Sequence, residues 1–162
     1  MNKRTALLAT LTSLMVLTGC ASTPAPVSIA DTAARTPQLA TLSKLINDAG
    51  LADTLRGTGP YTVFAPTDEA FKAVPAATLE ALGKDKERLK AVLAYHVVAG
   101  QVMSADLKNG PAKTLQGGSV ALSKSGTFVT VEDAVVTQAD VPATNGVVHL
   151  IDRVLMPPAA AK

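Results

Sequence analysis

Residues 59–71 read GPYTVFAPTDEAF, and within this stretch the sequence changes from strand-forming to helix-forming residues. Residues 61–65 are rich in β-branched and aromatic side chains and follow a Gly-Pro pair, which predicts a strand. Thr67 is a favourable cap for a helix N-terminus, and Asp68 and Glu69 would complement the dipole of the first turn. The stretch therefore predicts a strand that passes directly into a helix.

Before this stretch the apolar pattern is helical. Apolar residues recur at helical intervals from Leu39 to Ile46, and Gly50 ends the pattern. Because Pro37 interrupts the chain, we expect a short helix, a break and a second helix. Residues 51–55 predict one further helical turn.

After this stretch two helices lead into a strand. Residues 78–82 predict a short helix, and Asp85 can cap a second helix with an apolar stripe from Leu89 to Leu93. Residues 95–98 are β-prone and end at a glycine, which predicts a strand.

The remainder of the sequence favours strands and turns. Residues 119–123 and 127–131 flank a Lys-Ser-Gly sequence, an arrangement typical of a hairpin. Asn145 and Gly146 indicate a turn before residues 147–151, which are apolar on both faces and therefore predict a central strand. Because helices come first and strands later, the expected fold class is α+β.

Length, charge and cysteine content exclude several classes of protein. The 162-residue chain suits one domain or at most two small ones. It has 15 Lys and Arg against 13 Asp and Glu, and loss of a leader that contains Lys3 and Arg4 would leave equal numbers. A neutral chain without Trp lacks the basic surface and the aromatic platforms of nucleic-acid binders, so no nucleic-acid partner is expected. A single Cys excludes an intrachain disulfide and a multi-cysteine metal site.

The first 20 residues resemble a bacterial lipoprotein leader. Residues 1–4 are basic, and residues 5–16 are apolar but too short and interrupted for a membrane span of about 20 residues. The LTGC sequence that ends at Cys20 is similar to the lipobox, where a peptidase cuts before a cysteine that carries lipid. We therefore expect a signal peptide over residues 1–19 and a lipid anchor at Cys20. The alternative is an ordinary secreted protein with a free cysteine.

The leader sets the expected organisation and location of the chain. Residues 20–27 would form the lipidated cysteine and a Pro-rich tether, residues 28–157 the folded domain, and residues 158–162 a flexible tail. Ala21, rather than Asp, follows the cysteine, as in lipoproteins of the outer membrane. We therefore expect a lipid-anchored protein of the cell envelope, on the outer membrane, that faces either the periplasm or the cell surface.

Three motifs resemble the fasciclin domain family. Residues 59–71 are similar to its first signature, residues 143–152 (ATNGVVHLID) to its second, and Tyr95-His96 to the motif between them. The resemblance covers nearly all of residues 28–157, and it departs at Ala99, where the family often has proline. It implies a wedge in which a β-sandwich of roughly orthogonal sheets has the N-terminal helices packed over one end.

The two histidines of the mature chain are candidate metal ligands. A zinc site would need both His96 and His149 together with a carboxylate. Both are expected inside apolar strands, where we favour core histidines bonded to backbone or hydroxyl groups. Ser104 and the other serines of the strands do not stand in a Gly-x-Ser-x-Gly elbow, and a phosphate-binding loop is missing. We therefore expect that the protein is not an enzyme and that it has no metal site and no cofactor.

The family resemblance also implies candidate binding residues. In animal relatives the Tyr-His motif, and an Asp followed by a branched apolar residue, are linked to cell adhesion. The matching residues here are Tyr95, His96, Asp140 and Val141, and Pro142 departs from the family pattern. The alternative is that all four only support the fold.

The four candidates differ in their expected contribution to stability. We expect Asp140 in an exposed polar loop, where a substitution changes stability by about 0.5 kcal/mol or less. Loss of a buried, hydrogen-bonded His96 would cost on the order of 1–3 kcal/mol.

The expected function is a non-enzymatic, envelope-tethered binding module. It would serve cell adhesion or attachment to a matrix or host surface, with an unidentified protein or polysaccharide as partner. Residues 84–90, with four basic and two acidic side chains, could bind polyanionic glycans, although mixed charges favour a solvated helix face. The alternative function is a periplasmic scaffold or carrier that binds a small apolar ligand or an envelope protein.

Overall fold

The computed structural model describes residues 27–157, so the leader, Cys20, most of the tether and the C-terminal tail lie outside the described residues. The helices in this range are α1 (Ile29–Arg35), the 3-10 helix η1 (Pro37–Leu39), α2 (Ala40–Asp48), α3 (Ala52–Arg56), α4 (Asp68–Lys72), α5 (Ala76–Lys84) and α6 (Lys86–Tyr95). The strands in this range are β1 (Tyr61–Pro66), β2 (Val97–Ala99), β3 (Gly110–Lys113), β4 (Ser119–Ser125), β5 (Phe128–Val131), β6 (Ala134–Ala143) and β7 (Gly146–Ile151).

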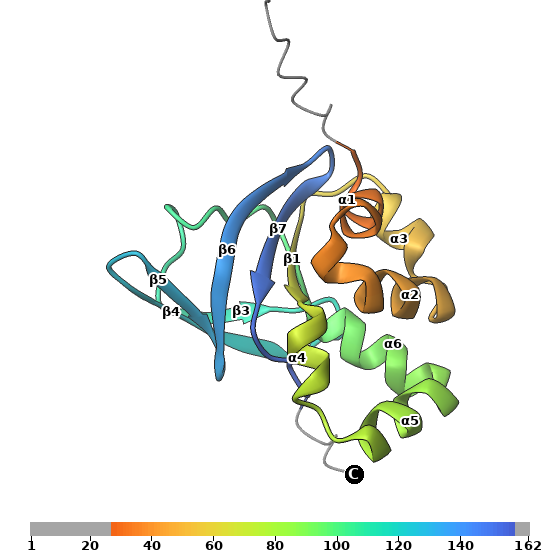
Figure 1. The fold of residues 1–162 in the computed structure, drawn as a ribbon. Coiled ribbons are helices and arrows are strands. Elements are labelled where there is room, and N and C mark those ends of the chain that lie inside the picture. Colours follow the sequence, from red (N-terminus) through yellow and green to blue (C-terminus); the bar gives the residue numbers. More distant parts are fainter. Residues whose placement is uncertain (1–26, 158–162) are drawn as a thin grey trace, which may run out of the picture.

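The seven strands form one sheet that almost closes on itself. Their order is β2-β1-β7-β6-β5-β4-β3, and only the β1–β7 pair is parallel. A bridge between Val98 and Thr114 brings the two ends of the sheet together. Strands β3 to β5 run across the direction of β1 and β7, and the helices pack at the other side of these two strands (Figure 1). The expected α+β class and the fasciclin-like wedge are confirmed.

Successive side chains of the central strands point to opposite faces of the sheet, and this divides the core into two clusters. In β1, Val63 and Ala65 point toward the helices, whereas Phe64 points into the folded sheet. In β7, Leu150 joins the helical cluster and Ile151 joins the cluster inside the sheet. Because β7 is buried on both faces and paired with both β1 and β6, the predicted central strand is confirmed.

The predicted junction between strand and helix is confirmed at residues 59–71. Strand β1 ends at Pro66, and the Thr67 hydroxyl accepts a hydrogen bond from the Ala70 N–H at the start of α4. The predicted cap at Asp85 is also present, because its carboxylate accepts from the Arg88 N–H at 3.0 Å. The predicted hairpin is β4–β5, with Ser125 paired to Phe128. Strand β4 extends two residues further than expected, and β5 begins one residue later than expected.

The predicted strand over residues 95–98 is wrong in its first half. Helix α6 continues to Tyr95, His96 has helical backbone angles, and β2 starts only at Val97. Leu89, Val92 and His96 follow one face of this helix, and their common burial outweighs the local β-propensity. His96 therefore caps a helix instead of lying in a strand, whereas His149 lies in β7 as expected.

Within residues 27–157, no helix combines the length and the apolar character that a membrane crossing requires.

Candidate functional site

The structure places the four candidate binding residues in two separate pairs. Tyr95 and His96 lie at the end of α6 and are buried, whereas Asp140 and Val141 lie in β6 and are half-buried. In the described part of the chain, no hydrogen bond connects the two pairs directly. They therefore do not form one exposed binding site.

His96 joins the end of α6 to the C-terminal segment. Its Nε2 accepts a hydrogen bond from the Leu155 N–H at 2.9 Å, so the proton is on Nδ1, which donates to the Val92 carbonyl at 2.8 Å. The side chain is 2% exposed, and this burial lowers its pKa to about 4. The ring is therefore neutral at neutral pH, with both nitrogens occupied by backbone groups.

Tyr95 anchors α6 to the sheet. Its hydroxyl lies 3.1 Å from the Ser119 carbonyl and 3.4 Å from Oε1 of Glu132. Burial raises the pKa of the Tyr95 hydroxyl, and the neighbouring Glu132 carboxylate adds to this effect. With its ring buried, Tyr95 is not available to a partner.

Asp140 holds a separate loop against the sheet. One carboxylate oxygen accepts from the Ser104 N–H at 2.7 Å, and the other accepts from the Ser104 hydroxyl. The Asp140 N–H donates to Nδ1 of His149 at 3.1 Å, and Nε2 of His149 donates to the Val102 carbonyl at 2.9 Å. We call Ser104, Asp140 and His149 the loop latch, because together they fasten residues 101–106 to β6 and β7.

Lys124 supports the loop latch from β4. Its ammonium group donates to the carbonyls of Ser104 at 2.7 Å and Ala105 at 2.9 Å. Partial burial disfavours the charged form of Asp140. The hydrogen bonds from Ser104, with the Lys124 charge nearby, nevertheless hold the pKa of Asp140 below its usual value. The carboxylate is thus engaged by the protein itself.

The loop latch brings together a serine, a histidine and an aspartate without the geometry of a catalytic triad. In a triad the histidine stands between the serine and the aspartate and accepts the serine proton. Here the Ser104 hydroxyl donates to the Asp140 carboxylate, and both His149 nitrogens bond to backbone groups. His149 also stacks on Phe64 in the core, with ring centroids 5.5 Å apart. The arrangement therefore fixes a loop and leaves no histidine to activate the serine.

The expectation that Asp140 lies in an exposed loop is wrong. Asp140 is part of β6, at a register shift against β7 between Gln138 and Val141, and its φ is +57°. Such a bulge turns the carboxylate toward Ser104. Sequence reasoning missed this arrangement because Ser104 lies 36 positions away and the polar run around Asp140 is typical of a loop.

Replacing Asp140 with alanine is expected to lower the free energy of unfolding by about 2 kcal/mol, because it removes hydrogen bonds to a charged group. Asp140→Asn keeps an acceptor for the Ser104 N–H and tolerates the left-handed backbone, so it should cost less than half as much. Urea denaturation measures both values, with Asp133→Ala, at an exposed turn, as the control. An Asp140→Ala protein as stable as the control variant would contradict the structural role of the latch.

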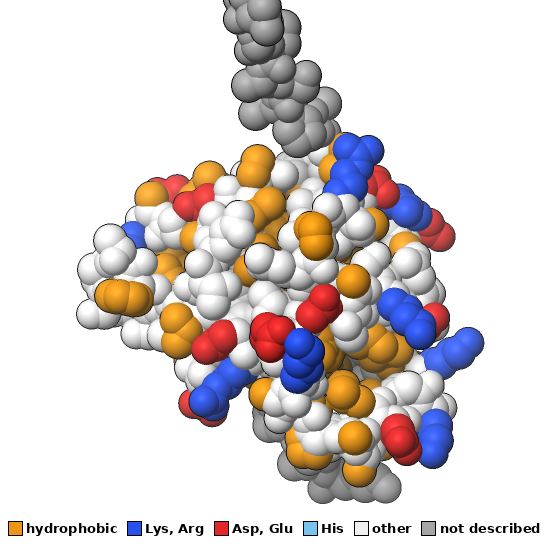
Figure 2. Space-filling view, in the orientation of Figure 1, with side chains coloured by type: hydrophobic (Ala, Val, Ile, Leu, Met, Phe, Trp, Pro, Cys, Tyr) orange, Lys and Arg blue, Asp and Glu red, His pale blue; other side chains and the backbone are white. Residues whose placement is uncertain are grey.

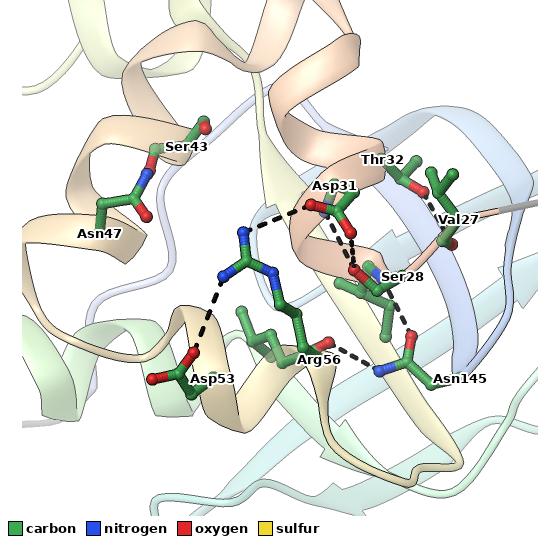
Figure 3. A network of polar contacts seen from close by, with 11 residues as sticks. Val27, Ser28, Asp31, Thr32, Ser43, Asn47, Asp53, Arg56 and Asn145 are labelled. Carbon is green, nitrogen blue, oxygen red and sulfur yellow. Dashed lines mark hydrogen bonds and ion pairs between the residues drawn. The ribbon is translucent and has the colours of Figure 1, made fainter.

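A second polar network lies where the described chain begins, around Val27 and α1 (Figure 3). The Asn145 amide group donates to the carbonyls of Leu55 at 2.7 Å and Gly57 at 2.9 Å, and its Oδ1 accepts from the Ile29 N–H at 3.0 Å. The Thr144 N–H donates to the Val27 carbonyl at 3.0 Å. Asn145 thus joins α1, α3 and the β6–β7 turn, and only its turn propensity was visible in the sequence.

Arg56 adds charged contacts to the same network. Its guanidinium lies 3.3 Å from Asp31 and 3.7 Å from Asp53. The hydrogen bond from Ser28, opposed by slight desolvation and supported by Arg56, lowers the pKa of the Asp31 carboxyl. These exposed pairs contribute little to stability, so Asn145 is the main link at this end of the domain.

Among residues 27–157, no cluster of three His, Cys, Asp or Glu side chains is placed to hold a metal ion. Both nitrogens of His96 and both nitrogens of His149 are engaged by backbone groups. The two histidines are therefore buried and internally bonded, as expected for core residues.

Comparisons with known proteins agree with this fold. The sequence model described as "Fasciclin domain" matches residues 37–157. The chain is 39% identical over 140 residues to Protein sll1483 of Synechocystis, an alignment that covers 85% of this chain and 78% of that protein. It is 42% identical over 139 residues to Immunogenic protein MPB70 of Mycobacterium bovis, which covers 83% of this chain and 70% of that protein.

A third relative and a solved structure complete the comparison. Cell surface glycolipoprotein MPB83 of Mycobacterium bovis is 41% identical over 136 residues, which covers 81% of this chain and 61% of that protein. The FAS1 domain pair of the insect cell adhesion molecule fasciclin I shares the fold, with a TM-score of 0.65 at 18% identity over 81% of this chain and 51% of that chain. The motifs, the fold and the extent of these matches lead to one conclusion: the chain belongs to the fasciclin domain family.

Proposed function

We propose that this protein is a non-enzymatic attachment module, fixed to the cell envelope by a lipid on Cys20, that binds a surface, matrix or host component through the loop that the latch holds. Two relatives are named as a cell surface glycolipoprotein and an immunogenic protein, which supports an exposed location. Within residues 27–157, the loop latch lacks the geometry of a catalytic triad, which supports binding rather than chemistry.

The single observation that carries the proposal is the loop latch. It fixes residues 101–106 through Asp140, His149 and Lys124, yet Gln101 and Met103 remain exposed on that loop. A loop that is already ordered loses less conformational freedom on binding, which favours affinity. Asp140 therefore acts by positioning the loop, and the exposed side chains of residues 101–106 make the contact with the partner.

This assignment divides the four candidate binding residues. Tyr95 and His96 are buried and support the fold. Asp140 holds the loop, and Val141 packs partly against the helical core cluster. Loss of attachment in a Tyr95 or His96 variant would then follow from loss of structure.

Cell attachment tests the proposal directly. Cells that carry the full-length protein are applied to surfaces coated with matrix proteins and polysaccharides. Met103→Ser should reduce attachment without a change in melting temperature, because Met103 is exposed. Phe128→Ser is the matched control, since Phe128 is a 71% exposed apolar side chain that lies outside residues 101–106. Equal attachment of cells with the wild type and with Met103→Ser would overturn the assignment of the loop.

The lipid anchor has its own test. Cys20→Ser should move the protein from the membrane fraction to the soluble fraction, or leave the precursor uncleaved, because stable anchoring depends on covalent acyl chains. Cell fractionation and the mass of the mature chain measure both outcomes. A processed Cys20→Ser protein that still fractionates with membranes would contradict the anchor. Protease treatment of intact cells then separates a surface-exposed module, which is removed, from a periplasmic one, which is spared.

A further inference from the structure

We propose that an apolar trough along α5 binds a free long-chain fatty acid, with its carboxylate at Arg88. The site is separate from the proposed attachment loop, because the trough and the latched loop share no residue. Only the choice of a free ligand over a bilayer lipid rests on the proposed anchor at Cys20.

Two hollows that meet at Thr78 and Met156 form the trough. The first, of about 670 Å³, lies between α5 and α6, with the buried Leu82 and Val92 at its base. The second, of about 620 Å³, lies on the α4 side of α5 and includes Val74. Each volume is typical of small-molecule sites, and together they suit an elongated ligand.

The lining of the first hollow is mostly apolar. Ala77, Ala81 and Ala91 leave room between the helices, and Met156 contributes an apolar side chain that is 42% exposed. On the face shown in Figure 2, hydrophobic side chains also gather over the region of α4 and α5, with charged side chains of both signs around them. A ligand with a long hydrocarbon chain would remove this apolar surface from water.

The charges at the trough favour an anionic head group. Arg88 lines the first hollow, and no carboxylate does. The second hollow is lined by both Asp152 and Arg153, so the unopposed charge of the trough is at Arg88. The two glutamates of this corner are already paired, Glu80 with Lys84 and Glu87 with Lys90. Asp85 caps α6 by accepting from the Arg88 backbone N–H. Among the described residues, the Arg88 guanidinium takes part in none of the ion pairs, so it can meet a ligand carboxylate.

The position of the trough favours a free ligand over a lipid within a bilayer. The described chain begins at Val27, next to α1, whereas α5 lies at the opposite end of the molecule (Figure 1). The proposed anchor at Cys20 would therefore direct the trough away from the membrane. Occupation by a released fatty acid fits this geometry better than occupation by a phospholipid chain.

The test uses residues 21–162, because the range 27–157 contains both core clusters and all of the helices and strands described. Fluorescence titration with cis-parinaric acid should show saturable binding that oleate displaces. Oleyl alcohol, without a charge, should displace it roughly fivefold less well, as expected for one exposed ion pair. Lysophosphatidylcholine, which lacks a free carboxylate, should displace it no better than oleyl alcohol.

Variants locate the site. Arg88→Gln should weaken binding of the probe roughly fivefold, whereas Arg88→Lys should keep most of the affinity. Lys44→Gln on α2 is the matched control and should leave the affinity unchanged. Ala81→Trp should abolish binding by filling the first hollow, and its exposed position in α5 leaves folding intact. Binding unchanged in both Arg88→Gln and Ala81→Trp would overturn the proposal. Binding that arises only after removal of residues 158–162 would also overturn it, because the tail would then be the occupant.

Discussion

Replacing Gly146 with alanine is expected to lower the free energy of unfolding by at least about 4 kcal/mol, a large part of the stability of a typical domain. Gly146 begins β7, pairs with Tyr61 of β1, and has a φ of +155°. A Cβ at this position would overlap the Tyr61 carbonyl oxygen and come within 2.9 Å of the Tyr61 nitrogen. Both atoms belong to the backbone of a central strand, so neither can move without separating β1 from β7.

The control for this substitution is Gly83→Ala. Gly83 lies in α5, and a Cβ there would meet no atom within 4 Å. Alanine favours the helix, so this variant should gain about 0.5 kcal/mol. Soluble yield and thermal unfolding of the two variants measure the contrast. A Gly146→Ala protein that melts within a few degrees of the wild type would show that the two strands tolerate more separation than the structure indicates.

Acidification from pH 6.5 to pH 4 is expected to remove about 3 kcal/mol of stability through His96 alone. Burial lowers the pKa of His96 in the folded protein from 6.5 to about 4. In the unfolded chain His96 is protonated below about pH 6.5, whereas in the folded protein it is protonated only below about pH 4. The contribution is fully present above pH 6.5 and is lost as the pH falls through this window.

A variant isolates this effect from other titrations. The His96→Gln protein cannot take up that proton, so its stability should fall less steeply between pH 6.5 and pH 4 than that of the wild type. Asp31 and Asp140, whose pKa values are lowered below 3.8, lose their contributions only at more acidic pH. Urea denaturation at several pH values gives the two profiles. Parallel profiles would show that burial does not lower the pKa of His96 in the folded protein.

The sequence by itself determined the features that depend on neighbouring residues. The strand that becomes a helix at Pro66, the caps at Thr67 and Asp85, and the central strand β7 were all predicted correctly. Each results from propensities, capping and periodicity within a few positions. The family motifs also predicted the wedge-shaped architecture, although they did not predict which distant residues contact each other.

Only the tertiary structure decided what the candidate site residues do. Asp140 meets Ser104 across 36 positions, and His96 meets the Leu155 N–H across 59 positions. Gly146 must lack a side chain because Tyr61 lies beside it in a parallel pair. Contacts of this kind leave no periodic pattern in the sequence, because they depend on how separate elements pack. An aspartate in a polar run therefore indicated an exposed loop, whereas packing placed it in a strand and occupied its carboxylate.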